Sequence, residues 1–172
     1  MPKGLAPLVA FLLVSFAPAS AQNKLNPLPP ACGPNNVSFD TKLDKSPPPL
    51  TPPEPGKAKI YFFQATGVSG MTTESGTTMF GIDGAWVGAI RGASYFSVSV
   101  DPGEHHICAA SRYFYRVAGT EVLALAHLQA EAGKTYYYRL RIGEYVELEP
   151  VDSDEGEFVI PYYPLSTFTP KK

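Results

Sequence analysis

The fold of this 172-residue chain is decided by residues 81–108, GIDGAWVGAIRGASYFSVSVDPGEHHIC. Asp83-Gly84 lies between short apolar runs and predicts a hairpin, because glycine accepts a positive φ without steric cost. Asp101-Pro102-Gly103 predicts a second turn, since proline presets φ and glycine closes the turn. Between these turns, residues 95–100 (YFSVSV) alternate with the period of a half-buried strand. The stretch therefore predicts successive β-strands.

The flanking segments continue the β pattern. Ala58–Thr66 has β-branched and aromatic residues on both faces, which predicts a central strand. Glu121–Glu131 is apolar on both sides and favours a buried strand, with a short helix as the alternative. In Lys134–Ile142 alternate residues form a core face: Tyr136, Tyr138, Leu140 and Ile142.

Together these segments predict an all-β fold. The predicted strands are 58–66, 77–83, 85–91, 95–100, 104–112, 121–131, 134–142 and 145–149, with a helical turn at 152–159. Short strands at this spacing need a second layer to bury their apolar faces. We predict a two-sheet antiparallel β-sandwich of about seven or eight strands, with a Pro-rich N-terminal extension.

The N-terminus has the pattern of a secretory signal peptide. Lys3 provides the positive charge, Leu5–Phe16 the apolar region, and Ala19-Ser20-Ala21 the cleavage site. This apolar run is shorter than the roughly 20 residues that span a bilayer, so the alternative of a membrane anchor is disfavoured. We expect the mature chain to be extracytoplasmic, in the periplasm or secreted, without a transmembrane helix.

Composition sets the remaining domain boundaries. Residues 45–56, KSPPPLTPPEPG, contain six prolines and predict an extended linker, either packed over the surface or mobile. The expected organisation is a signal peptide at 1–21, a Cys-containing and Pro-rich segment at 22–56, the sandwich domain at 57–160 and a tail at 161–172. The formal net charge is −2, which does not indicate a nucleic-acid partner.

Export determines how the two cysteines are interpreted. In an oxidising compartment a pair of cysteines is more often a disulfide than a metal or catalytic site, so we predict a Cys32–Cys108 bridge. The alternative is two independent thiols. With 75 residues between the cysteines, the chain-entropy contribution is about 4 to 5 kcal/mol.

Three histidines are the candidate residues for metal or hydrolytic chemistry. His105 and His106 are adjacent on a predicted strand, so their side chains should point to opposite faces and cannot easily share one ion. His127 could join either of them, depending on how the strands are placed. No Gly-x-Ser-x-Gly motif marks a nucleophile. We therefore assign no catalytic, metal-binding or cofactor-binding residues and expect no cofactor.

Two further groups of residues are candidate binding sites. Residues 144–157 contain seven acidic side chains, which we interpret as a solvated edge that opposes aggregation, with a weak calcium site as the alternative. Trp86 is expected in the core. Tyr113, Phe114 and Tyr115 are expected at a strand end or in a loop, and would favour a carbohydrate- or peptide-binding face if exposed together.

Several motifs in order resemble a known family. They are GIDG at 81–84 with Val87-Gly88, GASY at 92–95, PGEH at 102–105, EAGKTYY at 131–137 and ELEPVD at 147–152. Over roughly residues 55–160 this set resembles the bacterial envelope family named domain of unknown function 2846. Its first half is also similar to PEGA-type β-modules of bacterial surface proteins. The resemblance implies an exported, sandwich-like domain, and supplies no catalytic residues.

These observations favour a non-catalytic module of the cell envelope that recognises protein, peptide or glycan through a sheet edge or face. Main-chain recognition at a sheet edge needs no special side chains and leaves no motif. The alternative is a hydrolase or metal-dependent protein that uses His105, His106 or His127 with acidic residues. A pocket in which one of these histidines meets a carboxylate would favour that alternative.

Overall fold

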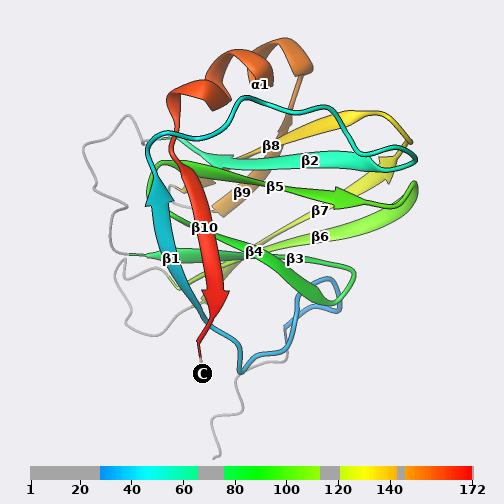
Figure 1. Cartoon of the computed structure of the whole chain (residues 1–172). Coiled ribbons are helices and arrows are strands. Elements are labelled where there is room, and N and C mark those ends of the chain that lie inside the picture. Colours follow the sequence, from blue (N-terminus) through cyan, green and yellow to red (C-terminus); the bar gives the residue numbers. More distant parts are fainter. Residues whose placement is uncertain (1–27, 66–75, 113–120, 143–145, 172) are drawn as a thin grey trace, which may run out of the picture.

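The computed structural model describes residues 28–65, 76–112, 121–142 and 146–171, which form two packed β-sheets (Figure 1). The six-stranded sheet A has the order β1-β10-β5-β2-β8-β9, and the four-stranded sheet B has the order β4-β3-β6-β7. The strands are β1 Phe39–Asp44, β2 Ala58–Gln64, β3 Thr77–Ile82, β4 Ala85–Arg91, β5 Ser94–Val100, β6 Gly103–Arg112, β7 Glu121–Ala130, β8 Thr135–Ile142, β9 Val146–Val151 and β10 Leu165–Pro170. A short helix α1, Ser153–Val159, and a 3-10 turn η2, Ile160–Tyr162, precede β10.

The all-β sandwich is confirmed. Strand β2 is central, between β5 and β8, as its two apolar faces predicted. Residues 121–130 form strand β7 and not a helix. At the Asp83-Gly84 hairpin both residues have positive φ, 50° and 87°, which explains the need for this dipeptide.

The prediction of seven or eight antiparallel strands was wrong in two respects. Within the described residues there are ten strands, and the pairs β2–β8 and β10–β5 are parallel. The additional strands β1 and β10 pair with each other and run side by side along one side of the molecule (Figure 1). β10 lies in the segment expected to be a tail. Both strands are short and rich in polar residues, so they have little of the apolar alternation that marks a strand in sequence.

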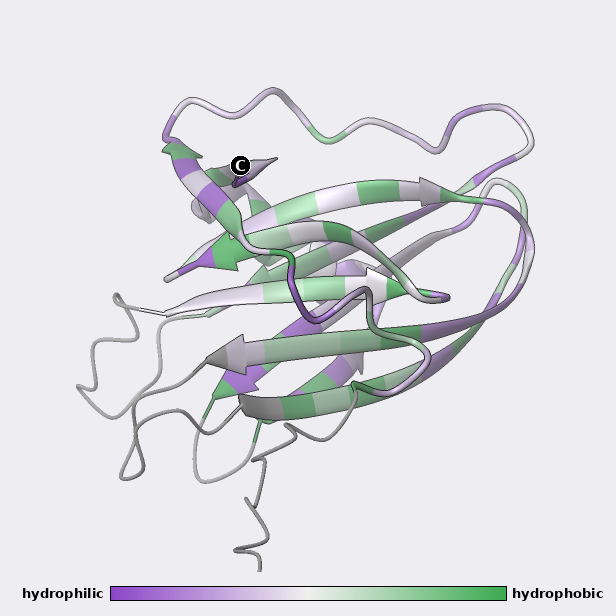
Figure 2. Ribbon diagram, turned by 90° about the horizontal axis from the view of Figure 1, so that it is seen from below, coloured by the Kyte–Doolittle hydropathy of each residue, from purple (hydrophilic) through white to green (hydrophobic). Residues whose placement is uncertain are grey.

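The main core lies between the two sheets. Figure 2 shows apolar and polar residues alternating along the strands, which is the pattern this packing needs. At its centre Phe62 of β2 packs against Phe80 of β3 and Phe96 of β5, with ring centroids 4.9 and 5.2 Å away. Each such fully buried phenylalanine contributes about 2 kcal/mol. From β8, Tyr138 and Leu140 enter this core, as predicted from their alternation.

A second apolar cluster covers the opposite face of sheet A. It contains Tyr61, Phe63, Tyr95 and Tyr137 from the sheet and Ile160 from η2. In Figure 1, α1 and the Pro-rich segment lie over this face. The Pro-rich segment, residues 45–57, contains no helix or strand and packs on the surface, which was one of the two expected outcomes. We call it the strap.

The N-terminal segment is tied to the outer face of sheet B. The predicted disulfide joins Cys32 to Cys108 of β6, with the two Cα atoms 5.2 Å apart. The Gly84 N–H donates to the Ala31 carbonyl at 3.2 Å. A Cβ atom on Gly81 would approach that carbonyl to 2.9 Å, so glycine permits the close passage of the segment. None of the described helices is long and apolar enough to cross a membrane.

We expect the double variant Cys32→Ser/Cys108→Ser to be less stable by about 2 to 5 kcal/mol, because the bridge restricts the unfolded chain. Urea unfolding of the mature protein measures the loss. A reducing agent should lower the stability of the natural protein toward that of the variant and leave the variant unchanged. Equal stability of the variant and the natural protein without reducing agent would contradict a stabilising role of the bridge.

Candidate functional site

The short helix α1 is held over sheet A by contacts in its first turn and at its middle. Asp152 caps the helix by accepting the Glu155 N–H at 2.8 Å. Arg139 of β8 pairs with Glu155 of the helix and, at 3.2 Å, with Glu149 of β9. Gly156 rests on the Tyr137 ring, and a Cβ atom at this position would collide with it. Residue 156 must therefore stay small for the helix to approach the sheet.

Lys59 holds the strap with all three N–H donors of its ammonium group. Lys59 is only 8% exposed, and its ammonium group donates to the Thr51 carbonyl (3.0 Å), the Thr51 hydroxyl (2.6 Å) and the Pro52 carbonyl (3.1 Å). An ammonium group has three N–H donors, so none is left for another partner. A further contact joins Ser99 to Glu54 of the strap at 3.0 Å.

Two adjoining pockets open at the start of β8. The first lies against the strap and α1, and the second against the β7–β8 turn and the end of β9. The first has a volume of about 460 Å³ and the second about 410 Å³, and Thr135 and Tyr137 line both. We call the pair the tyrosine groove. The first pocket is also lined by Leu50, Thr51, Pro52, Pro53, Tyr61 and Glu157, and the second by Glu131, Lys134, Tyr136, Tyr138, Pro150, Val151, Asp152 and Ser153.

The floor of the tyrosine groove is rigid and uncharged at neutral pH. Tyr61 and Tyr137 stack with centroids 5.3 Å apart and ring planes within 12°. Burial, and then the nearby charge of Glu157, raise the pKa of Tyr137 to about 12. Its phenol therefore stays protonated and does not act as a base. Tyr137 therefore contributes an uncharged ring to the floor of the groove.

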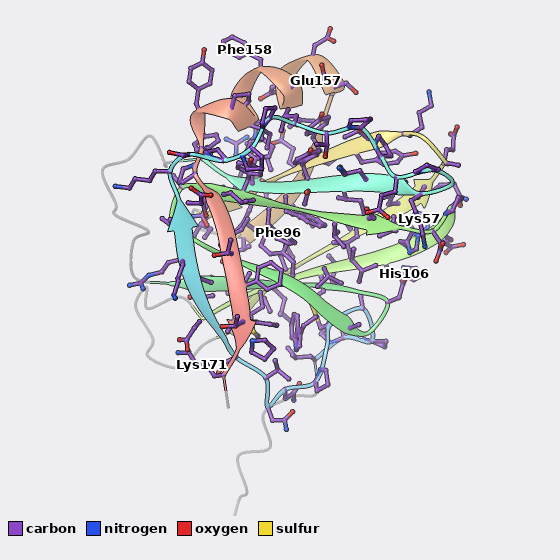
Figure 3. The ribbon with its side chains drawn as sticks, viewed as in Figure 1. Lys57, Phe96, His106, Glu157, Phe158 and Lys171 are labelled. Atoms are coloured by element: carbon purple, nitrogen blue, oxygen red, sulfur yellow. A yellow bond between two sulfur atoms is a disulfide. The ribbon has the colours of Figure 1, made fainter. Side chains whose placement is uncertain are left out.

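Two aromatic side chains project from the same end of the molecule. Phe158 is 68% exposed and Tyr162 75% exposed, with their ring centroids 5.6 Å apart. Figure 3 shows Phe158 and Glu157 on α1, at the opposite end of the molecule from Lys171. Successive helical residues are turned by about 100°, so Glu157 lines the groove while Phe158 points outward.

His105 and His106 point to opposite faces of β6, as predicted. His105 is turned inward, where its Nδ1 donates to the Asp83 carboxylate (2.6 Å) and its Nε2 to the Asp101 carbonyl (2.8 Å). Because both partners are acceptors, the protonated ring, with hydrogen on both nitrogens, satisfies both contacts. Burial by itself lowers the pKa of His105, but these two hydrogen bonds and the charges of Asp83 and Asp101 raise it above the usual 6.5. His105 therefore ties two turns together.

Asp83 is the other half of this contact. Partial burial alone raises the pKa of its carboxyl group, but hydrogen bonds from the His106 N–H and from His105 bring it below its usual value. The His106 N–H donates to Asp83 Oδ1 at 2.8 Å. The carboxylate is therefore ionised at neutral pH and accepts from both histidine residues.

His127 joins His106 on the outer face of sheet B. The two residues are directly opposite in the β6–β7 ladder, and Glu104 Oε1 lies 3.5 Å from His106 Nε2 and 3.1 Å from His127 Nε2. All three side chains are more than half exposed. In the part of the chain that the structure describes, no group of three or more His, Cys, Asp or Glu is arranged to hold a metal ion.

The acidic segment is more than the solvated edge that we predicted. Glu149 and Glu155 are used to hold Arg139, and Asp152 caps α1.

Trp86 is half-buried and donates to the Pro34 carbonyl at 2.8 Å, so it packs under the N-terminal segment. Tyr113, Phe114, Tyr115 and Glu144 lie outside the described residues.

Sequence reasoning missed the tyrosine groove and the Phe158–Tyr162 pair. The groove is formed by residues from the strap, β2, β8 and α1, which are far apart in the chain. One signal was available: Phe158 interrupts the acidic run, and an apolar residue in a polar helical turn indicates either core or a contact surface.

Replacing His105 with glutamine should destabilise the protein most at or below pH 6.5. A raised folded-state pKa means that the stabilisation is fully present below the unfolded-state value near 6.5 and is lost as the pH rises through the folded-state pKa. Urea unfolding of both proteins from about pH 5 to 9 measures the difference. In an Asp83→Asn background, which keeps an acceptor but no charge, the pH dependence should shrink. A difference that is constant with pH would contradict this assignment.

Comparison with known proteins finds one family. Residues 54–151 match the model of a family described as "Protein of unknown function (DUF2846)", which agrees with the resemblance seen in the sequence. No curated protein and no solved structure matches the chain. The likeness to PEGA-type modules stays a prediction.

Proposed function

Since the chain belongs to the DUF2846 family, whose description names no activity, we propose its function from the geometry. The protein is a non-catalytic module of the cell envelope that binds a protein, peptide or glycan. The binding surface is the α1 face of sheet A, consisting of the tyrosine groove and the exposed pair Phe158 and Tyr162.

The exposed aromatic pair carries this proposal. Large apolar side chains that lie together and are exposed to solvent often mark an interaction site. Tyrosine is also enriched among the residues that dominate binding energy at protein interfaces. Phe158 directly follows Glu157, which lines the first pocket, and its ring centroid lies 5.6 Å from that of Tyr162. Ligand sites are concave, and the two pockets of the tyrosine groove combine aromatic rings with polar and charged side chains.

Three of the four edge strands, β7, β9 and β1, are less suited than this face to binding by strand addition. At the β7 edge, the Tyr136 and Tyr138 hydroxyls donate to the Gln129 and His127 carbonyls, both at 3.3 Å. The β9 edge contains Pro150, which has no N–H to donate. Along β1 the exposed side chains are mostly charged, a pattern that opposes edge-to-edge pairing.

Export is part of the proposal. The support is the signal-peptide pattern of residues 1–21, which lie outside the described part of the chain, and the Cys32–Cys108 disulfide. Disulfides persist in the periplasm and outside the cell, and are rare in the cytosol.

A hydrolase is the second candidate, because His105 contacts the Asp83 carboxylate as a catalytic histidine contacts its orienting acid. In that arrangement the other ring nitrogen must be free to take a proton from a nucleophile. Here His105 Nε2 is bonded to the Asp101 carbonyl. The contact therefore favours a structural role, and a hydrolytic activity that His105→Gln abolishes would reverse this conclusion.

The double variant Phe158→Ser/Tyr162→Ser should lose its partner in a crosslinking pull-down from the native envelope. Exposed substitutions of this kind change stability by only about 0.5 kcal/mol, so the fold should persist. Leu125→Ser, at a 57% exposed leucine on sheet B, is the matched control and should recover the same partner as the natural protein. Equal recovery by the double variant would refute a role for the α1 face.

A further inference from the structure

The charges that line the tyrosine groove are mostly negative. Glu131, Asp152 and Glu157 contribute three carboxylates, and Lys134 contributes one ammonium group. Within the described residues, no ion pair involves any of these three carboxylates. By contrast, the nearby Glu149 and Glu155 are neutralised by arginine. The groove therefore carries a net charge of −2. Asp152 has a role in the fold as the cap of α1, whereas Glu131 and Glu157 form no ion pair with the described residues.

Lys59, which holds the strap, does not neutralise the carboxylates of the groove. Lys59 lies beneath the strap and directs all three of its N–H donors to strap oxygens. It does not line either pocket. A ligand in the groove would therefore meet carboxylates, tyrosine hydroxyls and the strap, and only Lys134 as a positive group.

The aromatic pair beside the groove suits the same kind of ligand. Arginine and lysine side chains combine an apolar stem with a cation, and arginine also stacks on aromatic rings. Phe158 and Tyr162 present such rings next to Glu157. A neutral apolar peptide would use the rings and leave the carboxylates without partners.

We infer that the tyrosine groove binds a basic, extended peptide segment of the partner, with arginine or lysine side chains directed at Glu157 and at the Glu131–Asp152 end. This inference rests on the proposed function and specifies the chemistry of the partner. Electrostatic complementarity of this kind sets specificity and association rate more than total affinity.

Hexa-arginine amide is the probe, and hexa-citrulline amide is its uncharged control. Binding to the full mature chain is measured by calorimetry at low salt, and its position by amide chemical-shift changes. We expect hexa-arginine to bind and to shift the amides of Thr135 and Tyr137, and hexa-citrulline to bind much more weakly. The triple variant Glu131→Gln/Asp152→Ser/Glu157→Gln should weaken hexa-arginine binding about tenfold. Serine at 152 keeps a helix cap while removing the charge.

A second triple variant separates the groove from the general charge of the protein. Asp40→Asn/Asp44→Asn/Glu147→Gln removes the same charge from β1 and β9, outside the groove, and should change the affinity by less than about twofold. If the groove variant does not fold, Glu157→Gln alone should still weaken binding. Equal weakening by both triple variants, equal binding of the two peptides, or no binding of hexa-arginine would overturn the inference. If hexa-arginine does not bind while Phe158→Ser/Tyr162→Ser still loses its partner, the inference fails and the proposed function stands.

Discussion

The structure depends on the burial of sheet A on both faces. Its central strand β2 directs Ile60 and Phe62 into the core between the sheets, and Tyr61 and Phe63 to the opposite side. An apolar sheet face that stays in water promotes aggregation, so a second cover is needed beyond sheet B. Here that cover is a seven-residue helix, a 3-10 turn and the irregular strap. Such a thin layer cannot close completely over six strands, and the tyrosine groove lies where it stays open.

The charged groups divide into those that hold this cover in place and those that do not. Lys59 fastens the strap, and Arg139 fastens α1 through Glu155. On the other side of the core, Asp83 and His105 join two turns. Exposed ion pairs contribute at most about 1 kcal/mol each, so their effect is mainly on position. Of the carboxylates around the groove, Asp152 caps α1, whereas Glu131 and Glu157 have no such task, which is why these two indicate a ligand rather than the fold.

Local patterns predicted the frame and not the site. The Asp83-Gly84 turn, the alternation in β8 and the two apolar faces of β2 are properties of consecutive residues, and each was confirmed. The pairing of β1 with β10 joins residues more than 120 positions apart, and neither strand has a strong apolar alternation. The groove likewise combines Thr51, Tyr137 and Glu157 from separate elements. No periodicity within one segment could have shown that these side chains meet.

The extent of the family match bears on where specificity arises. The matched residues, 54–151, begin near the end of the strap and stop at the last residue of β9, so they contain β2 to β9. Glu157, Phe158 and Tyr162 follow the matched region, and most of the strap precedes it. The floor of the groove, Tyr61 and Tyr137, and the exposed Glu131 and Lys134 therefore belong to the matched part of the chain. Glu157, the aromatic pair and most of the strap come from the flanking segments. The binding surface is thus completed by segments outside the matched sandwich, which fits the general rule that function resides in the site rather than in the fold.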